Sequence, residues 1–210
     1  MSTDELAVYD ARIELIDFCI EVFHDAPTEE FLSHLLAGDM RTPEDSVNER
    51  LDAGFEHLRT FVDAHEGDDV EELHTDLRRA YTEVFVGPRP PVLLHETNYR
   101  DDTEFIGEGL AEVEASYDAA GWPLPDDYPE ENDFIAVEIA FLQYLIDRQR
   151  DGDEEAVGFE RVFLEEHLDH WIDDFLADLR EETDDGLFLA AALICRGFVQ
   201  FEHTVVSQVG

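Results

Sequence analysis

Apolar residues recur at helical spacing along most of this chain, and this period restricts the possible folds more than any other feature. Between Asp4 and His24, for example, one stripe holds Leu6, Tyr9, Ile13, Ile16, Cys19, Ile20 and Phe23. Similar stripes predict helices over residues 28–36, 43–66, 70–85, 103–120, 134–146, 159–179 and 187–205. No convincing alternation of apolar and polar residues indicates a strand. We therefore expect an all-α fold of about eight or nine helices.

Local signals refine two of these helices. Thr42, which is followed by Pro43, has the residue type and position of an N-cap for the helix that begins there. The helix over 159–179 is expected to bend near His167.

The exception to the helical period is the stretch from Val84 to Tyr99, which contains three prolines and only two charged residues. Proline removes a backbone donor and disfavours the helical conformation of the residue before it. A regular helix is therefore expected to stop near Phe85 and not to restart before about Asp101. A long apolar connection is more often functional than not, although packing against the core would also explain it. We interpret the chain as one domain over residues 1–210, with N-terminal helices (4–85), a loop (86–102) and C-terminal helices (103–207).

Two helices are nearly uncharged, which places them in the centre of the bundle. Glu138 carries the only charge of the helix over 134–146. In the helix that starts at Leu187, Arg196 is the only charged residue among the first twelve. A lone buried charge is costly without a partner, so we predict that these helices touch and that Glu138 pairs with Arg196. The pair would either fix the register of the helices or bind a ligand. Asp133 is expected to cap the helix that carries Glu138.

The composition is strongly acidic, with 54 Asp and Glu against 13 Lys and Arg, all of them Arg, and a formal net charge of -41. Charges of this density repel one another at low salt, but at about 1 M salt the screening length falls to about 3 Å. We infer a halophilic protein from a salt-accumulating cytoplasm, whose acidic surface is an adaptation to the solvent. Scattered Arg residues cannot form a basic patch, so nucleic acid is not an expected partner.

The sequence predicts a cytoplasmic protein without stable membrane insertion. The N-terminus lacks the basic region and apolar stretch of a secretion signal, and no run reaches the roughly 18 apolar residues of a membrane span. The two cysteines, Cys19 and Cys195, provide neither a disulfide framework nor a zinc site. Both are expected to be small buried apolar residues.

Catalytic and metal-binding patterns are weak in this sequence. It contains neither a nucleophile elbow nor a glycine-rich phosphate loop. Two Glu-x-x-His motifs, at residues 21–24 and 71–74, have the spacing of di-iron sites in helical bundles, but so acidic a chain should contain roughly two by chance. His167 and His170 can share a helix face, without an evident third ligand. We expect no metal, no cofactor and no enzymatic activity, and keep a metal-binding helical-bundle enzyme as an alternative.

Three motifs together resemble the TorD/DmsD family of redox-enzyme maturation chaperones, to which the NarJ group is related. Residues 81–88 and 96–99 are similar to the family patterns aromatic-x-x-Leu-Phe-x-Gly-Pro and Glu-Ser-x-Tyr. Residues 131–142 resemble Pro-Asp-His-Ile-x-x-Glu-Leu-x-Phe-Met, and residues 163–175 match Phe-x3-His-Leu-x2-Trp-x3-Phe. The order and spacing of the motifs agree over roughly residues 75 to 200, whereas the N-terminal third is similar only in its apolar helices.

The resemblance implies an all-helical cytoplasmic chaperone that binds the twin-arginine leader peptide or the apoprotein of a molybdoenzyme catalytic subunit. Such proteins hold the subunit back from export until the molybdenum cofactor is inserted, and they are not enzymes. The positions implicated in peptide binding would be Tyr81, Phe85, Gly87, Pro88, Glu96, Tyr99, Asp133, Phe134 and Glu138. Phe134 stands where the family has a histidine, and Thr97 and Asn98 also depart from its pattern.

Recognition of a leader at high salt would rest on apolar burial and on short-range pairs with specific carboxylates, such as Glu96 or Asp133. A non-catalytic scaffold that binds other proteins without delivering a cofactor has the same sequence features and stays open as an alternative. The sequence does not determine the client reductase, among enzymes for dimethyl sulfoxide, trimethylamine oxide, nitrate and related substrates. Nor does it decide between a monomer and a helix-swapped dimer.

Overall fold

In the computed structural model, the described residues (3–40, 42–43, 46–100, 107–123 and 130–208) form helices and their connections, with no strand among them. The α-helices are α1 (Thr3–His24), α2 (Glu29–Leu36), α3 (Glu49–Ala64), α4 (Val70–Tyr81), α5 (Glu108–Ala120), α6 (Ile135–Arg150), α7 (Glu155–Phe163), α8 (Asp169–Glu182) and α9 (Gly186–Gln208). They are joined in places by π segments η1 (Thr82–Val86) and η3 (Leu164–Leu168) and by the 3-10 turn η2 (Glu96–Asn98). This confirms the all-α single domain. The first residues of the helix expected over 103–120 lie outside the described residues.

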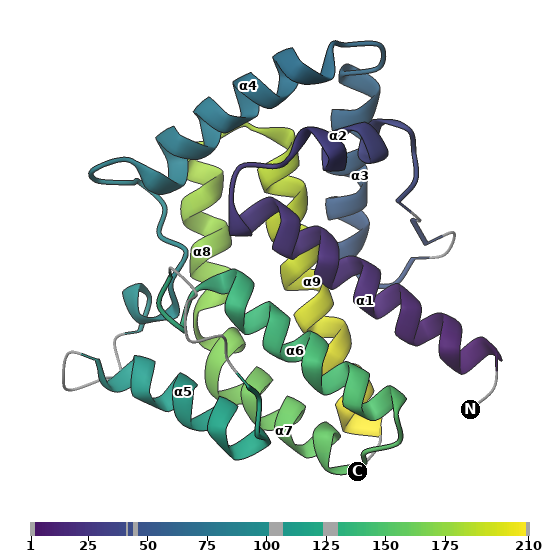
Figure 1. Cartoon of the computed structure of the whole chain (residues 1–210), viewed down its shortest axis with the longest axis vertical. Coiled ribbons are helices and arrows are strands. Elements are labelled where there is room, and N and C mark those ends of the chain that lie inside the picture. The colour runs from purple at the N-terminus through teal and green to yellow at the C-terminus, as the bar shows by residue number, and fades with distance from the viewer. Residues whose placement is uncertain (1–2, 41, 44–45, 101–106, 124–129, 209–210) are drawn as a thin grey trace.

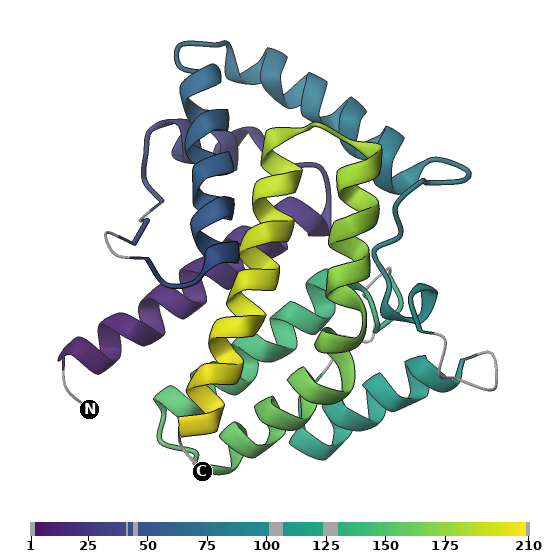
Figure 2. The ribbon, with the colours of Figure 1, turned by 180° about the vertical axis from the view of Figure 1, so that it is seen from behind.

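Helix α9 runs through the bundle and packs against α1, α3, α7 and α8, while α1 also packs against α6 (Figures 1 and 2). Helices α3 and α9 approach closely because each carries a glycine where they meet. A Cβ on Gly54 would lie 2.7 Å from the Ile194 side chain, and one on Gly197 would lie 2.5 Å from the backbone nitrogen of Leu51. Helices from both ends of the chain therefore share one core.

By length and composition alone, α9 could cross a membrane. However, 61% of its most apolar 18-residue window is buried inside the bundle. Its position as a core helix accounts for this apolarity, as the sequence predicts for its nearly uncharged first half.

The clearest error in the expected helix boundaries concerns the start of α3. Thr42 does not cap this helix, because Asn48 does: the Leu51 backbone N–H donates to the Asn48 side chain at 2.9 Å. The Asn48 side-chain amide also donates to the carbonyl of Gly197 on α9 at 2.9 Å. The start of α3 is therefore fixed by a contact with another helix as well as by local capping.

The two π segments mark places where the sequence predicts a helix to end or bend. In η1 the backbone N–H of Gly87 donates to the carbonyl of Thr82 at 2.9 Å, and the helix ends there, close to Phe85 as expected. The segment η3 separates α7 from α8 and contains His167, which confirms the predicted bend. Segments of this kind are frequent at functional sites, and η3 contributes to the site described below.

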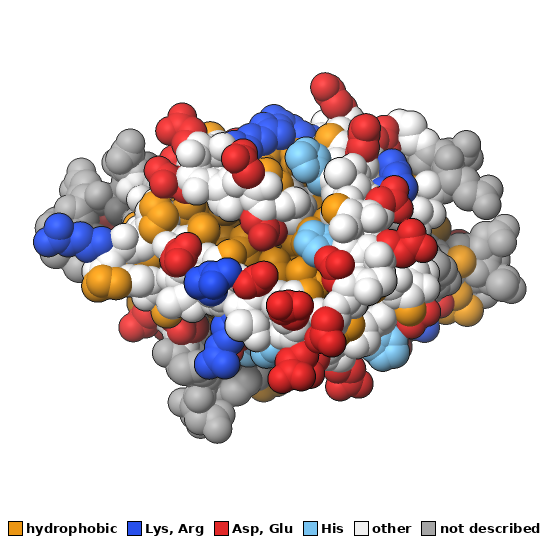
Figure 3. Space-filling model, turned by 90° about the horizontal axis from the view of Figure 1, so that it is seen from above, with side chains coloured by type: hydrophobic (Ala, Val, Ile, Leu, Met, Phe, Trp, Pro, Cys, Tyr) orange, Lys and Arg blue, Asp and Glu red, His pale blue; other side chains and the backbone are white. Residues whose placement is uncertain are grey.

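Figure 3 looks onto the end of the bundle where α4 lies. Acidic side chains are spread over this face, and apolar side chains gather in a depression in its middle. A hollow of about 570 Å³ lies at this end, between α3, α4 and the start of α9. Its lining mixes apolar side chains such as Leu73 and Leu77 with carboxylates such as Asp69 and Asp185.

Candidate functional site

Backbone hydrogen bonds hold the Pro-rich loop against the start of α6. The N–H of Ile135 donates to the carbonyl of Leu94 at 2.8 Å, and the N–H of Glu96 donates to the carbonyl of Asp133 at 3.0 Å. The two stretches thereby form an isolated antiparallel bridge. Two separate parts of the sequence, each of which supplies predicted site residues, therefore meet in space.

Asp133 fastens the loop to the start of α6. Its buried carboxylate accepts hydrogen bonds from the backbone N–H and the hydroxyl of Thr97, at 3.1 and 2.5 Å, and lies 3.0 Å from Nδ1 of His95. Burial alone would raise the pKa of Asp133, but the hydrogen bonds with His95 and Thr97 outweigh it and lower the pKa. The expectation that Asp133 caps α6 is wrong, because Phe134 occupies the N-cap position and the Asp133 carboxylate binds the loop instead.

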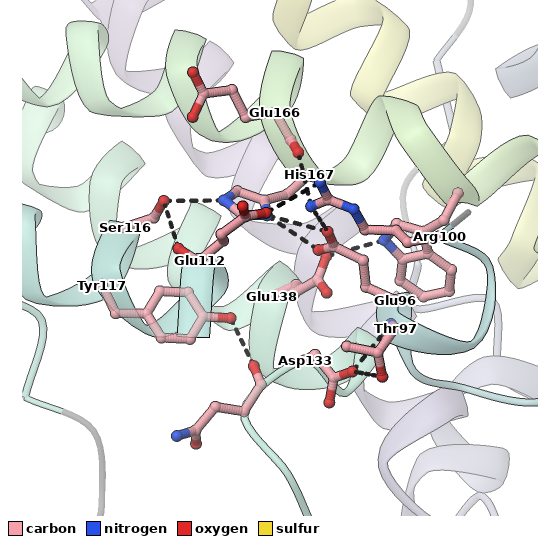
Figure 4. Close-up of polar contacts among 12 residues, drawn as sticks. Glu96, Thr97, Arg100, Glu112, Ser116, Tyr117, Asp133, Glu138, Glu166 and His167 are labelled. Atoms are coloured by element: carbon pink, nitrogen blue, oxygen red, sulfur yellow. Dashed lines mark hydrogen bonds and ion pairs between the residues drawn. The ribbon is translucent and has the colours of Figure 1, made fainter. Parts of the chain in front are cut away.

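Glu96 is fully buried and lies at the centre of the polar contacts in Figure 4. Its carboxylate accepts a hydrogen bond from Nη1 of Arg100 at 2.7 Å, and Nδ1 of His167 lies 3.2 Å from both of its oxygens. The other ring nitrogen of His167 lies 2.9 Å from the hydroxyl of Ser116 on α5. One buried carboxylate thus connects the loop with η3 and, through His167, with α5.

Glu138 projects from α6 next to Glu96 and is likewise fully buried. One of its oxygens accepts the indole N–H of Trp171 at 3.2 Å, whereas Oε1 has no hydrogen-bond partner among the described residues. Burial raises the pKa of Glu138 well above its usual range, and the negative charge of Glu96 raises this pKa further. The raised pKa favours the neutral form of Glu138. Glu96 and Glu138 are called the buried carboxyl pair below.

Glu138 does not pair with Arg196, so this prediction is wrong. Arg196 faces α8, where it contacts the carboxylates of Asp169 at 3.3 Å and Asp173 at 3.0 Å. Its side chain remains 19% exposed, and it therefore has no need of a buried partner on α6. The hydrogen bond from Trp171 reduces the cost of burying Glu138, and the raised pKa favours its neutral form, which needs no ion pair.

Three of the predicted aromatic residues, Tyr81, Phe85 and Tyr99, belong to one series of ring contacts beside this pair. Tyr99 stacks on Trp171 with ring centroids 5.6 Å apart. The series continues through Phe175, Phe23, Phe85 and Tyr81. Tyr81 and Phe85 are buried, and the Tyr81 hydroxyl donates to the carbonyl of Phe23 at 2.8 Å. These two side chains support the site from within the core.

The turn that follows η1 reaches the surface. Gly87 is partly buried and Pro88 is exposed. On either side of the three prolines, Val86 is 60% exposed and Leu93 is 37% exposed. The loop therefore presents apolar side chains to the solvent while its end is fixed to α6.

A hollow of about 620 Å³ borders the polar network between α5 and the α7–η3 region. Its lining includes three members of the network, Arg100, Ser116 and His167. The rest of the lining is largely apolar, with Ala115, Ala119, Phe159 and Val162. It also includes His170 and the carboxylates of Glu112 and Glu166. Glu96 and Glu138 lie behind this lining. The hollow is of a size typical for ligand sites in proteins.

The structure adds His95, Arg100, Ser116, His167 and Trp171 to the predicted site residues. His167 and Trp171 stand four positions apart in the motif 163–175, so the resemblance already contained a signal for them. The spacing of Glu96 and Arg100 is also four, which is a weak signal in so acidic a chain. No sequence pattern pointed to Ser116.

Asp133 does have a histidine neighbour, although position 134 holds phenylalanine. The neighbour is His95, which comes from the loop and whose ring contacts Phe134 at a centroid distance of 5.3 Å. The pairing of the two stretches therefore places an imidazole beside the Asp133 carboxylate from the opposite side.

Among the described residues, no group of three or more His, Cys, Asp and Glu side chains could hold a metal ion. His74, from one of the Glu-x-x-His motifs, lies 3.3 Å from Glu29 on α2. His170 is exposed, whereas its neighbour His167 is buried against Glu96. Cys19 and Cys195 are free and buried, as expected.

The described residues thus form an all-helical bundle in which a group of buried carboxyl residues lies beside a partly apolar hollow. The family model described as nitrate reductase delta subunit matches residues 44–177, which is more than half of the chain. The chain belongs to this family, and its general role is that of a chaperone in molybdoenzyme maturation. No curated protein matches the chain. The narrower resemblance to the TorD/DmsD branch stays a prediction.

Proposed function

We propose that this chaperone acts in the cytoplasm, where it binds the twin-arginine leader of a molybdoenzyme catalytic subunit until the cofactor has been inserted. The observation that carries the proposal is the meeting of the loop with α6, which gathers Glu96, Asp133 and Glu138 near a partly apolar hollow. A twin-arginine leader combines two guanidinium groups with an apolar run. Carboxylates and apolar side chains complement these two chemistries.

The high density of surface carboxylates favours a salt-rich cytoplasm as the place of action. At multimolar salt a net charge of -41 is screened beyond a few ångström and cannot steer a leader from a distance. Binding then depends on contacts that exclude water, which the buried carboxyl pair and the apolar lining provide. The leader affinity is therefore expected to persist as KCl is raised above the concentration that folding requires.

The first experiment is a pull-down of the tagged protein from its own cells, kept throughout in multimolar KCl, with mass spectrometry of the bound proteins. We expect a molybdoenzyme catalytic subunit that still carries its Arg-Arg leader. The matched control is the same subunit expressed without its leader. Equal recovery of the two forms would contradict leader binding and favour the scaffold, which would bind the mature protein surface.

Metal analysis of the purified protein addresses the remaining alternative, a metal-binding enzyme. A stoichiometric metal in protein purified without added metal would favour that alternative. A folded, metal-free protein that still captures the leader-bearing subunit would support the chaperone.

A further inference from the structure

Arg100 binds Glu96 but leaves one oxygen of the neighbouring Glu138 without a hydrogen bond. Nη1 of Arg100 donates to Glu96 at 2.7 Å and to the carbonyl of Glu166 at 3.5 Å, and Nη2 lies 3.1 Å from a Glu112 oxygen. Oε1 of Glu138, next to Glu96, is fully buried and has no hydrogen-bond partner among the described residues. An unsatisfied buried acceptor is uncommon and costs free energy.

Arg100 lies between the hollow and this pair. It lines the hollow, its side chain is 7% exposed, and it contacts the Glu96 carboxylate directly. A group that enters from the hollow therefore meets Arg100 before it reaches Glu96. Figure 4 shows the same order, with Arg100 and His167 on one side of Glu96 and Glu138 on the other.

We propose that Arg100 is an internal counter-ion whose place on Glu96 is taken by an arginine side chain of the client. The incoming guanidinium binds Glu96 and donates to Oε1 of Glu138, and Glu138 releases its proton to the solvent as the positive charge arrives. This inference rests on the proposed function, because it assigns one arginine of the leader to a particular site. When the client's arginine displaces Arg100 from Glu96, Arg100 still has a partner. It already contacts Glu112, which lines the hollow and whose side chain is 49% exposed.

The geometry favours a guanidinium over an ammonium group. A guanidinium carries five N–H donors in a planar fork and can reach two carboxyl groups at once, whereas a lysine ammonium acts as a compact point charge. The apolar part of the hollow lies next to the same position and includes Ala119, Phe159 and Val162. An arginine followed by apolar residues, as in a leader, would fill both parts.

The test uses a synthetic peptide that carries an Arg-Arg pair followed by an apolar run, with binding measured by fluorescence anisotropy in multimolar KCl. Arg100→Gln removes the internal competitor and is expected to tighten binding at least about tenfold, which corresponds to about 1.4 kcal/mol. Arg196→Gln is the matched control: it removes another arginine that contacts two carboxylates, away from the hollow. It should leave the affinity unchanged. Arg100→Lys keeps the charge and should give an intermediate affinity even if Arg100→Gln folds poorly by circular dichroism.

A second peptide, with citrulline in place of both arginines, separates this inference from the proposed function. Citrulline keeps the shape of arginine but not its charge, so the gain from Arg100→Gln should be absent with this peptide. If folded wild-type protein binds both peptides equally, or if Arg100→Gln weakens binding of the arginine peptide, the exchange is refuted while leader binding stands. If neither peptide binds wild type or any variant, the proposed function and the exchange both fail.

Discussion

Replacement of Glu138 by Gln tests whether the buried carboxyl pair holds a proton. Glutamine has the shape of a neutral glutamic acid, and its amide oxygen can still accept the indole N–H of Trp171. If Glu138 is neutral in the folded protein, the variant keeps every contact of the wild type. It loses only the possibility of ionisation.

The expected magnitude follows from the direction of the pKa shift. Burial and the charge of Glu96 raise the pKa of Glu138 above its ordinary value of 4.5, so above this pH the folded protein keeps a proton that the unfolded chain releases. The free energy of unfolding of the wild type therefore falls as the pH rises, by up to about 1.4 kcal/mol per pH unit for this group. The fall ends once the pH exceeds the raised pKa. Because Gln does not titrate, the stability gain of Glu138→Gln over wild type should grow at the same rate until the pH passes the raised pKa.

The assay is urea unfolding at a series of pH values in multimolar KCl, followed by tryptophan fluorescence, to which Trp171 contributes directly from the site. Glu112→Gln is the control, because it makes the same change at the 49% exposed carboxylate on the other side of Arg100. Its stability difference from wild type should be small at every pH. A pH-independent difference for Glu138→Gln, or a large destabilisation at neutral pH, would refute the reasoning and show that the ionised form of Glu138 is needed.

Three further predictions concern ion pairs and helix packing, and each is checked by urea unfolding. Arg196→Gln should cost no more than about 1 kcal/mol, since it loses only partly exposed ion pairs; a loss of several kcal/mol would indicate a buried partner. Gly197→Ala should cost about 1–3 kcal/mol because the new Cβ would lie 2.5 Å from a backbone nitrogen of α3. The control Gly158→Ala, where a Cβ would have nothing within 4 Å, should stabilise α7 by about 0.5–1 kcal/mol. Equal effects of the two variants on stability would contradict the close packing of α3 and α9. Arg12→Met should cost about 3–5 kcal/mol because it leaves two buried glutamates without their cation. This cost should shrink in acid, where both can be protonated, and a constant cost would exclude the explanation.

The helices could be predicted from the sequence because their causes are local. Apolar spacing located the elements, and proline chemistry predicted the end of the helix near Phe85. The start of α3 was misplaced because the Asn48 side chain also donates a hydrogen bond to the carbonyl of Gly197, about 150 residues further along the chain. A cap that depends on such a contact leaves no sign in the surrounding residues.

The site was only partly accessible from the sequence. The motifs indicated that the loop and the start of α6 belong together, but the hydrogen bonds that join Leu94 to Ile135 and Glu96 to Asp133 have no sequence pattern of their own. The predicted pairing of Glu138 with Arg196 is wrong. A single charged residue in an apolar helix indicates that the residue is buried, but it does not indicate what offsets the free-energy cost of burying it. Protonation is invisible in a sequence, since it depends on how closely Glu96 approaches.

In a chain with 54 acidic residues, burial is what distinguishes the informative carboxylates from those that face the solvent. Five of the described ones are buried, and they form two groups. Glu160 and Glu202 share Arg12 and join α7 and α9 to α1, which is sufficient to explain them as internal structure. Glu96, Asp133 and Glu138 instead gather where the loop meets α6, and the only guanidinium among their described contacts, that of Arg100, also lines a hollow. A partner's arginine that enters this hollow would therefore meet the second group through Arg100, as proposed above.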